Sequence, residues 1–383
     1  GLKVAIFEKN ELLGRKILST GNGRCNFTNE LINEHCLNSG SSEEQLLDFD
    51  SYINTLKLYD SLGIRTKSIN GFYYPLTNQA KTVKDSFESE IKSLNCNVYL
   101  SSEIHTIVSK ENGYAISDNN HTFYGKYIVL ACGGKAAPAV GGTDKGYILA
   151  EQLGLKVSEI YPALTGFLSN DSRLKLLAGV RAQGKVTFED KSFEGEIQFN
   201  KDGISGYPVM CLSRHITSKT SDDRSVKLVI DFIPELNEKD LNTELSRRFN
   251  VNNSNKSVGE ALIGLIHEKC LQAILVDMHM VPSSSALTVT EEEIHELVKA
   301  LKNFSIKITK SKGFEGAQVT AGGVLLNQIN LDTMMVNSSK YKDVYVVGEL
   351  LDVDGICGGY NLEWARHSAM CAANDIIKKY DSD

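Results

Sequence analysis

The sequence predicts an α/β fold in which one domain is built from both ends of the chain. Three compact apolar runs support this, at Lys3–Phe7, Tyr127–Ala131 and Val344–Val347, and each leads into an acid or a glycine. Short apolar runs bounded in this way are typical of buried parallel strands. We therefore expect residues 1–160 and 315–383 to form a single discontinuous domain.

The middle of the chain has a different texture. From Gly179 to Phe232, short alternating segments are broken by Gly and Asp, which favours antiparallel strands. Beyond residue 236 the apolar spacing becomes helical. It predicts helices over Leu241–Phe249, Val258–Val276 and Glu291–Phe304. We expect an inserted β domain over residues 161–235 and an inserted helical region over residues 236–314.

Further elements are predicted inside the discontinuous domain. Apolar residues recur at helical spacing over Glu43–Leu62 and over Thr82–Leu94. Tyr114–Ser117 and His121–Tyr124 flank a short polar turn, which predicts a hairpin. A last helix is expected from about Leu362 to Lys379.

Composition limits the kind of protein. The 383 residues are 42% hydrophobic and 23% charged, and no apolar run approaches the ~20 residues of a membrane span. No stretch has the layout of a signal peptide, so we expect a cytoplasmic protein without a membrane partner. The net charge of −7 argues against nucleic acid as a partner and leaves a small-molecule substrate.

The eight cysteines are scattered, without a C-x-x-C pair. A disulfide framework or a zinc site normally brings cysteines closer together in sequence. We therefore expect reduced thiols and no metal site. Cys25 and Cys357 lie in glycine-rich segments, but we do not expect them to form a redox-active pair.

Glu8 directly follows the first apolar strand. In a dinucleotide-binding βαβ unit, an acid at this place accepts hydrogen bonds from the adenosine ribose hydroxyls. The alternative is a strand-ending glutamate that faces solvent. The glycine-rich turn of such a unit lies roughly 20 residues before the acid. Because Gly1 stands immediately before the strand, we expect that further residues precede it.

Residues 14–26 form a loop with three glycines and with Asn22, which also tolerates a positive φ angle. Glycine allows backbone amides to approach a planar ring or a phosphate closely. The adjacent cations Arg15 and Lys16 can offset the charge of a pyrophosphate. The alternative for this segment is a plain flexible loop.

Two further glycine-rich segments follow predicted strands. Ala131 leads into Gly133 and Gly134, where a tight turn is the alternative. The C-terminal block is stronger, because a strand ends in Gly348–Glu349 and Gly355–Leu362 then enters a helix. The carboxylate suits the hydroxyls of a ribityl chain, and the amides of a helix N-terminus suit the N1–C2 carbonyl edge of a flavin.

These segments resemble the BaiN-like family of flavoproteins over nearly the whole chain. The resemblance is carried by Gly14–Lys16, Thr20–Asn29, Val319–Val324, Gly348–Gly355 and Gly358–Asn361. The family comprises FAD-dependent oxidoreductases, among them aminoacetone oxidases and bile-acid reductases. The resemblance implies noncovalently bound FAD, a Rossmann-type FAD-binding domain, and an inserted antiparallel β-barrel with a helical segment. It also implies that backbone near Ile104 holds the adenine.

The motifs and the resemblance together predict a set of cofactor-binding residues. They are Glu8, Gly14, Arg15, Lys16, Thr20, Gly21, Asn22, Gly23, Arg24, Cys25, Ile104, Ala131, Gly133, Gly134, Gly348, Glu349, Gly359, Tyr360, Asn361 and Leu362. No residue type in the inserted region is singled out as a catalytic acid or base.

The expected activity is two-electron transfer through flavin N5 on a small organic substrate such as an enone, with NAD(P)H as the reductant. One alternative is an oxidase that uses oxygen to oxidise a small amine such as aminoacetone. A second alternative is an RNA-directed or non-catalytic flavoprotein. The acidic net charge weighs against RNA, and the sequence does not separate the reductase from the oxidase.

Overall fold

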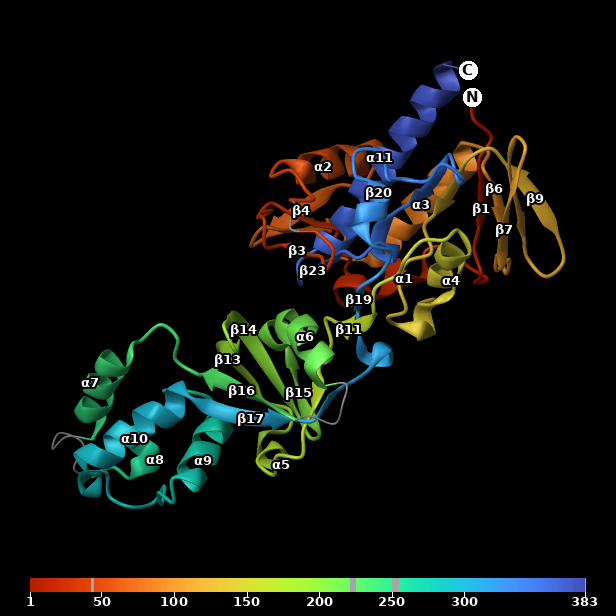
Figure 1. Ribbon diagram of the computed structural model, residues 1–383. Coiled ribbons are helices and arrows are strands. Elements are labelled where there is room, and N and C mark those ends of the chain that lie inside the picture. The colour runs from red at the N-terminus through yellow and green to blue at the C-terminus, as the bar shows by residue number, and fades with distance from the viewer. Residues whose placement is uncertain (43–44, 221–224, 250–254, 383) are drawn as a thin grey trace. The chain divides into compact units, whose positions relative to one another are not determined.

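The computed structural model describes residues 1–42, 45–220, 225–249 and 255–382 of the chain (Figure 1). These residues form two compact units. The first combines Gly1–Ala163 with Phe314–Asp383, and the second is Leu164–Gly313. Both ends of the chain therefore contribute to the first unit.

A four-stranded sheet joins the two halves of the first unit. Strand β10 (Ile128–Leu130) lies parallel to β22 (Val344–Val346), and the order continues with β21 (Met335–Val336) and β20 (Ile329–Asn330). All three residues of β22 are buried, as expected for a strand that is covered on both faces of the sheet. This pairing connects residues that are more than 200 positions apart.

The remaining strands of the first unit form small sheets around this one. Strand β1 (Ala5–Phe7) pairs in parallel with β6 (Asn97–Tyr99). The others are β2 (Thr28–Asn29), β3 (Leu37–Asn38), β4 (Thr66–Ile69), β5 (Phe72–Pro75), β7 (Thr106–Lys110), β8 (Gly113–Ser117), β9 (Thr122–Gly125), β11 (Tyr161–Ala163), β19 (Val319–Ala321) and β23 (Asp354–Gly355). The predicted hairpin is confirmed as β8 and β9.

Helices of the first unit pack around these sheets. They are α1 (Arg15–Ser19), α2 (Ser51–Ser61), α3 (Ala80–Ser93), α4 (Lys145–Gln152) and α11 (Tyr360–Ser382), with short 3-10 turns at Thr20–Gly23, Pro138–Val140, Phe314–Gly316, Leu326–Gln328 and Gly348–Leu350. Two apolar clusters form the core. One surrounds Tyr345 of β22 and Trp364 of α11, and a smaller one surrounds Phe27 and Tyr59.

The second unit is a seven-stranded antiparallel sheet with helices. Its strand order among the described residues is β17-β16-β13-β14-β15-β12-β18. The strands are β12 (Phe167–Leu168), β13 (Arg181–Phe188), β14 (Lys191–Asn200), β15 (Gly203–Gly206), β16 (Val226–Asp231), β17 (Phe304–Ile308) and β18 (Lys310–Ser311). The helices are α5 (Leu174–Leu177), α6 (Tyr207–Thr220), α7 (Glu238–Arg248), α8 (Val258–Ala261), α9 (Glu268–Asp277) and α10 (Glu291–Lys302), with a 3-10 turn at Ala286–Thr288. One continuous apolar core joins sheet and helices.

The inserted sheet is not the closed barrel that the resemblance implied. Strands β17 and β18 are its two edges, and no pairing between described residues joins them. Only Thr309 separates the two strands along the chain. Strand β17 pairs with β16, and strand β18 pairs with β12. The sheet therefore stays open in its hydrogen-bond order.

Two predicted helices have different bounds in the structure. The helix predicted over Val258–Val276 is interrupted, because the His267 side chain accepts a hydrogen bond from the Lys269 amide and starts α9 anew. The helix predicted over Glu43–Leu62 begins only at Ser51, and residues 43–44 lie outside the described residues.

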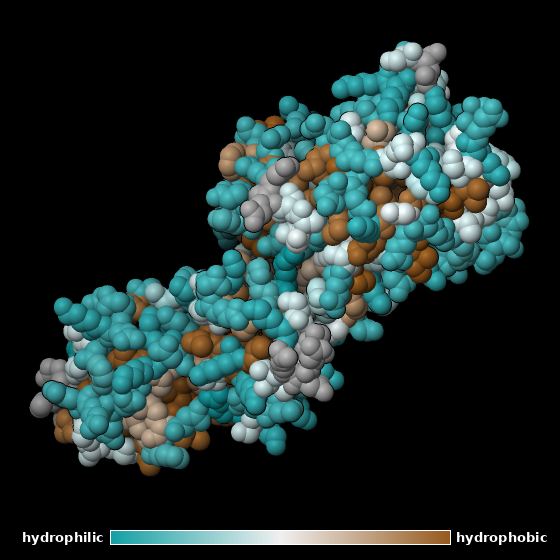
Figure 2. Space-filling model, viewed as in Figure 1, coloured by the Kyte–Doolittle hydropathy of each residue, from teal (hydrophilic) through white to brown (hydrophobic). Residues whose placement is uncertain are grey.

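Polar residues cover most of the visible face, with apolar residues in scattered groups (Figure 2). Within the described residues, no helix combines the length and the apolar character that crossing a membrane requires.

Candidate cofactor-binding site

The carboxyl ends of β10 and β22 deliver two predicted segments to the same edge of the sheet. Parallel strands end side by side, and ligands of open α/β sheets bind outside this edge. Leu130 is buried, whereas the next residue, Ala131, is exposed. After β22 the chain turns at Gly348 and presents Glu349. The sheet therefore places both glycine-rich turns at one edge.

Glu349 connects four segments of the chain. Its Oε2 lies 2.7 Å from Lys16 Nζ in the N-terminal loop, and its Oε1 accepts a hydrogen bond of 2.9 Å from the Thr320 amide. Thr320 Oγ1 in turn accepts a hydrogen bond of 2.9 Å from the amide of Ala136, just after the β10 turn. The N-terminal loop, the β10 turn, β19 and the C-terminal block thus meet at one carboxylate.

The β10 turn fits this junction only without side chains. A Cβ atom at Gly134 would lie 2.5 Å from Thr320 Oγ1 and 2.6 Å from Glu349 Oε1, far inside van der Waals contact. Gly133 has a φ angle of 67° and has open space where a Cβ would project. The turn therefore packs tightly on one side and leaves bare backbone on the other.

The N-terminal loop has an unusual backbone. Left-handed conformations occur at Gly14, Gly21, Asn22, Gly23 and Cys25. Beside Lys16, the Arg15 guanidinium donates a 3.0 Å hydrogen bond to the Ala139 carbonyl and a 3.3 Å one to Asn10 Oδ1. This loop is therefore attached both to the β10 segment and to the C-terminal block.

A second junction lies where the N-terminal segment meets the start of α11. A Cβ at Gly359 would lie 2.8 Å from the Thr28 amide nitrogen, so only glycine allows the two backbones to approach. Asn29 Nδ2 donates a 3.2 Å hydrogen bond to the Gly358 carbonyl. Asn361 holds the turn before the helix by exchanging two hydrogen bonds with the Gly355 backbone, at 2.8 and 2.9 Å.

Glu8 and Ile104 lie on two neighbouring segments of backbone, which follow the paired strands β1 and β6. The Glu8 amide donates to the Tyr99 carbonyl, and the Glu8 carbonyl accepts from the Ser102 amide at 3.0 Å. Ile104 follows two residues later and is half-buried. The Glu8 carboxylate accepts both Asn10 donors at Oε1, at 2.8 and 2.6 Å. The structure thus brings these two predicted residues near each other.

Several predicted side chains turn away from the glycine-rich edge. Cys25 is fully buried beside Phe27, and burial raises the pKa of its thiol to about 11, so this side chain is part of the packed interior. The Arg24 guanidinium lies over the Tyr74 ring, 5.1 Å from its centroid. Thr20 Oγ1 donates to the Ile17 carbonyl at 2.6 Å.

The aromatic and apolar residues at the start of α11 also serve packing. The Tyr360 hydroxyl donates to the Leu31 carbonyl at 3.0 Å, and Leu362 packs against the Phe27 cluster. Sequence reasoning missed Thr320 and Glu363 as members of the site. Thr320 lies inside the Val319–Val324 block that carries the resemblance, whereas Glu363 shows no local signal other than an acid near the start of a helix.

The residues present fit a bound flavin nucleotide. Asp352, between Glu349 and Gly359, is 1% exposed, and neither of its carboxylate oxygens has a hydrogen-bond partner among the described residues. A buried carboxylate without a donor is costly, and the N–H and O–H groups of a flavin imide or a ribityl chain are donors of the kind it lacks. The open space beside the Gly133 backbone leaves room for a bound group at the edge that also carries Glu349.

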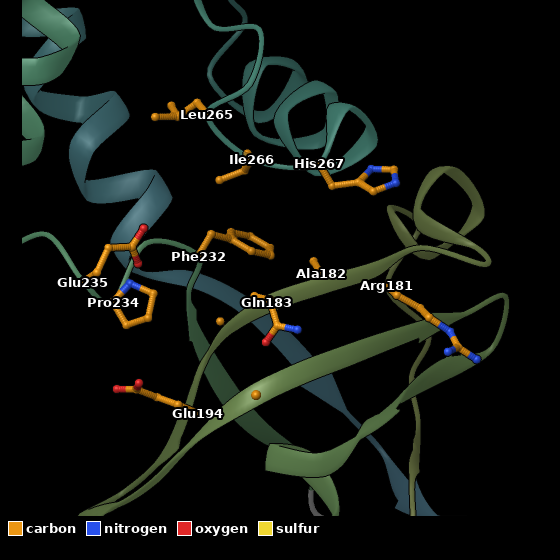
Figure 3. Close-up of a pocket in the computed structure, with 12 residues that line it drawn as sticks. Arg181, Ala182, Gln183, Glu194, Phe232, Pro234, Glu235, Leu265, Ile266 and His267 are labelled. Carbon is orange, nitrogen blue, oxygen red and sulfur yellow. The ribbon is translucent and has the colours of Figure 1, made fainter. Parts of the chain in front are cut away.

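A separate groove lies within the second unit (Figure 3). It has a volume of about 380 Å³ between β13, β14 and the loop that starts α9. Phe232, Pro234 and Ile266 form its apolar side, and Glu194 and Glu235 flank it. Its walls lack the strand-ending glycine turns found in the first unit. It can hold a small amphipathic molecule, but it does not resemble a nucleotide site.

Comparison with known proteins identifies the family of the chain. The model of a protein family described as "HI0933-like protein Rossmann domain" matches residues 1–375. This match, together with a similar reductase described below, defines the class of the protein as an FAD-dependent oxidoreductase with a Rossmann-type FAD-binding domain. The chain belongs to the HI0933-like family, which confirms the expected resemblance to BaiN-like flavoproteins.

Similar proteins span nearly the whole chain. A 3-dehydro-bile acid delta(4,6)-reductase of Clostridium scindens is 34% identical and covers 95% of this chain and 90% of its own length. A ribosomal RNA dihydrouridine synthase of Escherichia coli is 28% identical, with 98% and 92% covered. A solved 3-ketosteroid-delta4-(5alpha)-dehydrogenase from Rhodococcus jostii is 12% identical, with a TM-score of 0.44 over 97% of this chain and 91% of that one.

Proposed function

We propose that the protein is a reductase that transfers a hydride between flavin N5 and an activated double bond of a small organic substrate, with NAD(P)H as the reductant. The FAD would supply the two-electron chemistry when it is bound. The observation that carries the proposal is the meeting of four sequence-distant segments at Glu349. The similar reductase from Clostridium scindens supports an enone-like substrate.

Each part of the edge has a distinct task in this proposal. The bare backbone of the β10 turn and the Lys16 cation hold the nucleotide, and Glu349 exchanges its cation partner for ribityl hydroxyls. Glu8 and the backbone around Ile104 bind the adenosine end. Amides at the start of α11 orient the pyrimidine edge of the ring. The chain thus contributes binding, orientation and electrostatics.

Reconstitution and anaerobic reduction test this function. The purified protein is incubated with FAD, desalted and examined for flavin absorbance, and then titrated with NADH or NADPH without oxygen. We expect bound flavin, bleaching by one of the two nucleotides, and reoxidation by a steroid-type enone. A protein that retains no flavin would contradict the cofactor assignment. A bound flavin that neither nucleotide reduces would contradict the reductase.

The oxidase alternative is separated in the same experiment. If a small amine such as aminoacetone bleaches the flavin and oxygen restores it with formation of peroxide, the protein is an oxidase. Under the reductase proposal, amines leave the flavin oxidised, and admission of oxygen yields peroxide more slowly than the enone is reduced.

A second candidate function is the reduction of uridine in ribosomal RNA. It is favoured by the E. coli relative and by one from Haemophilus influenzae that is 26% identical over 99% of this chain and 94% of its own length, both named ribosomal RNA dihydrouridine synthase. The acidic net charge opposes it. Incubation of the reduced holoprotein with ribosomal RNA, followed by nucleoside analysis for dihydrouridine, decides between RNA and an enone as acceptor.

A further inference from the structure

The first helical turn of α11 contains a carboxylate that is completely shielded from solvent. Glu363 is 0% exposed. Its Oε2 accepts hydrogen bonds from Thr28 Oγ1 at 2.6 Å and from Thr55 Oγ1, and its Oε1 accepts from Ser51 Oγ at 2.8 Å. The Arg366 guanidinium forms an ion pair with the same Oε1. Both oxygens of the buried carboxylate therefore have hydrogen-bond donors, and these donors are held in fixed positions relative to each other.

The partners of Glu363 come from three separate elements. Thr28 lies in β2, at the end of the N-terminal segment, and Ser51 and Thr55 lie four residues apart on one face of α2. Arg366 lies one helical turn further along α11. All three hydroxyl donors are buried. The carboxylate therefore locks β2 and α2 onto the start of α11.

The hydrogen-bond network of Glu363 adjoins the second junction of the candidate site. The Glu363 amide donates to the Gly359 carbonyl at 3.0 Å, and Gly359 is the residue whose missing Cβ lets Thr28 approach. Thr28 thus contacts Gly359 through its backbone and Glu363 through its side chain. A change at Glu363 shifts Thr28 and Gly359 together, although its side chain faces away from solvent.

We propose that Glu363 is a positioning residue for the flavin, because it fixes how the N-terminal segment packs on Gly358–Gly359. Its negative charge also reduces the positive electrostatic potential at the N-terminus of α11. The inference rests on the proposed binding of FAD at this site. Amides of a helix N-terminus favour an anionic reduced ring. A carboxylate within the same first turn opposes that preference, and Arg366 compensates only part of it. Glu363 thus holds the reduction potential of the bound flavin down.

Two substitutions separate charge from positioning. Glu363→Gln keeps the size and one acceptor oxygen but removes the charge. We expect flavin affinity about tenfold weaker and a shift of the two-electron equilibrium toward reduced flavin by about tenfold, which equals about +30 mV. Thr55→Val keeps the charge and removes one donor. It should weaken flavin binding a few-fold and leave the potential unchanged. Exposed Glu151→Gln in α4 is the matched control and should change neither quantity.

The measurements are the dissociation constant of FAD for the desalted apoprotein and the potential of the bound flavin against a reference dye. Circular dichroism and thermal unfolding confirm that each variant is folded, and Thr55→Val carries the positioning test if Glu363→Gln does not fold. Equal affinity and potential in Glu363→Gln and wild type would overturn the inference, as would weaker binding with an unmoved potential. A wild-type protein that takes up no flavin would instead overturn the proposed function.

Discussion

The two junctions that join the N-terminal segment to the C-terminal block differ in burial and in the kind of bond. At Glu349 a single lysine provides the cation, and the Lys16 and Glu349 side chains are 32% and 17% exposed. At Glu363 three hydroxyls and a guanidinium surround a carboxylate with no exposure. The first is a bond that water and salt can replace, whereas the second cannot open without unfolding its surroundings.

The difference indicates a division of labour along the candidate site. Under the proposed function, a ligand would displace Lys16 or share Glu349 with it, so an exchangeable ion pair is suited to the edge proposed to receive the nucleotide. The start of α11 must instead keep a fixed position, because amides orient a ring only if they are held in place. Substitutions of the two cations, Arg366 and Lys16, test this contrast directly.

Arg366→Met should have the largest effect. It leaves Glu363 buried without its cation, and breaking one side of such a pair costs about 3–5 kcal/mol. We expect that loss in the free energy of unfolding, with little dependence on salt. Denaturant titration monitored by the fluorescence of Trp364 reports it, because the only tryptophan lies in the same helix and is buried. Lys81→Met, in an exposed pair with Asp85, is the control. A loss below about 1 kcal/mol in Arg366→Met would show that the pair is not effectively buried.

Lys16→Met should be much milder. A partly exposed ion pair contributes less than about 1 kcal/mol, and screening reduces it further. In the same titration we expect a small loss at low ionic strength that disappears in high salt. Binding of FAD should weaken by a few-fold, again mostly at low salt. A salt-independent loss as large as that of Arg366→Met would abolish the contrast between the two junctions.

The sequence predicted the parts of this site that are encoded locally. The strands β10 and β22 are short apolar runs that end in glycine, and the pattern alone placed the residues that follow them at a sheet edge. Positive φ angles at Gly14, Gly21 and Asn22 agree with the residue types that favour them. These features depend on neighbours within a few positions, which a single sequence contains.

The contacts between distant positions could not be predicted in the same way. Thr28 and Glu363 are 335 residues apart, and a threonine and a glutamate have no period that announces their pairing. Cys25 was predicted at the cofactor, yet its neighbours in space bury its side chain. Strands β17 and β18 lie at the two ends of the strand order among the described residues, which the local pattern around Thr309 does not announce. Each outcome is decided by tertiary packing.

The pH dependence that His367 causes has the smallest expected effect, and it tests whether water reaches the Glu363 junction. Burial lowers the pKa of His367 below its usual value of 6.5; Arg366 lowers it further, while Glu363 and Asp48 act in the opposite direction. Cys371 Sγ lies 3.7 Å from its Nε2. The folded protein therefore resists protonation that the unfolded chain accepts. The contribution of neutral His367 to stability is fully present above the pKa of the unfolded chain. It is lost as the pH falls through 6.5 toward the lowered pKa of the folded protein.

His367→Gln should remove part of this pH dependence. We expect the variant to lose less stability than wild type between about pH 7 and about pH 5, by under about 1 kcal/mol, with little difference above pH ~7.5. Unfolding at a series of pH values, again monitored by Trp364, measures the effect. Exposed His35→Gln is the control and should follow the wild-type curve. If His367→Gln also follows it, protons reach the folded imidazole freely, and the Glu363 junction is then open to water on its α11 side.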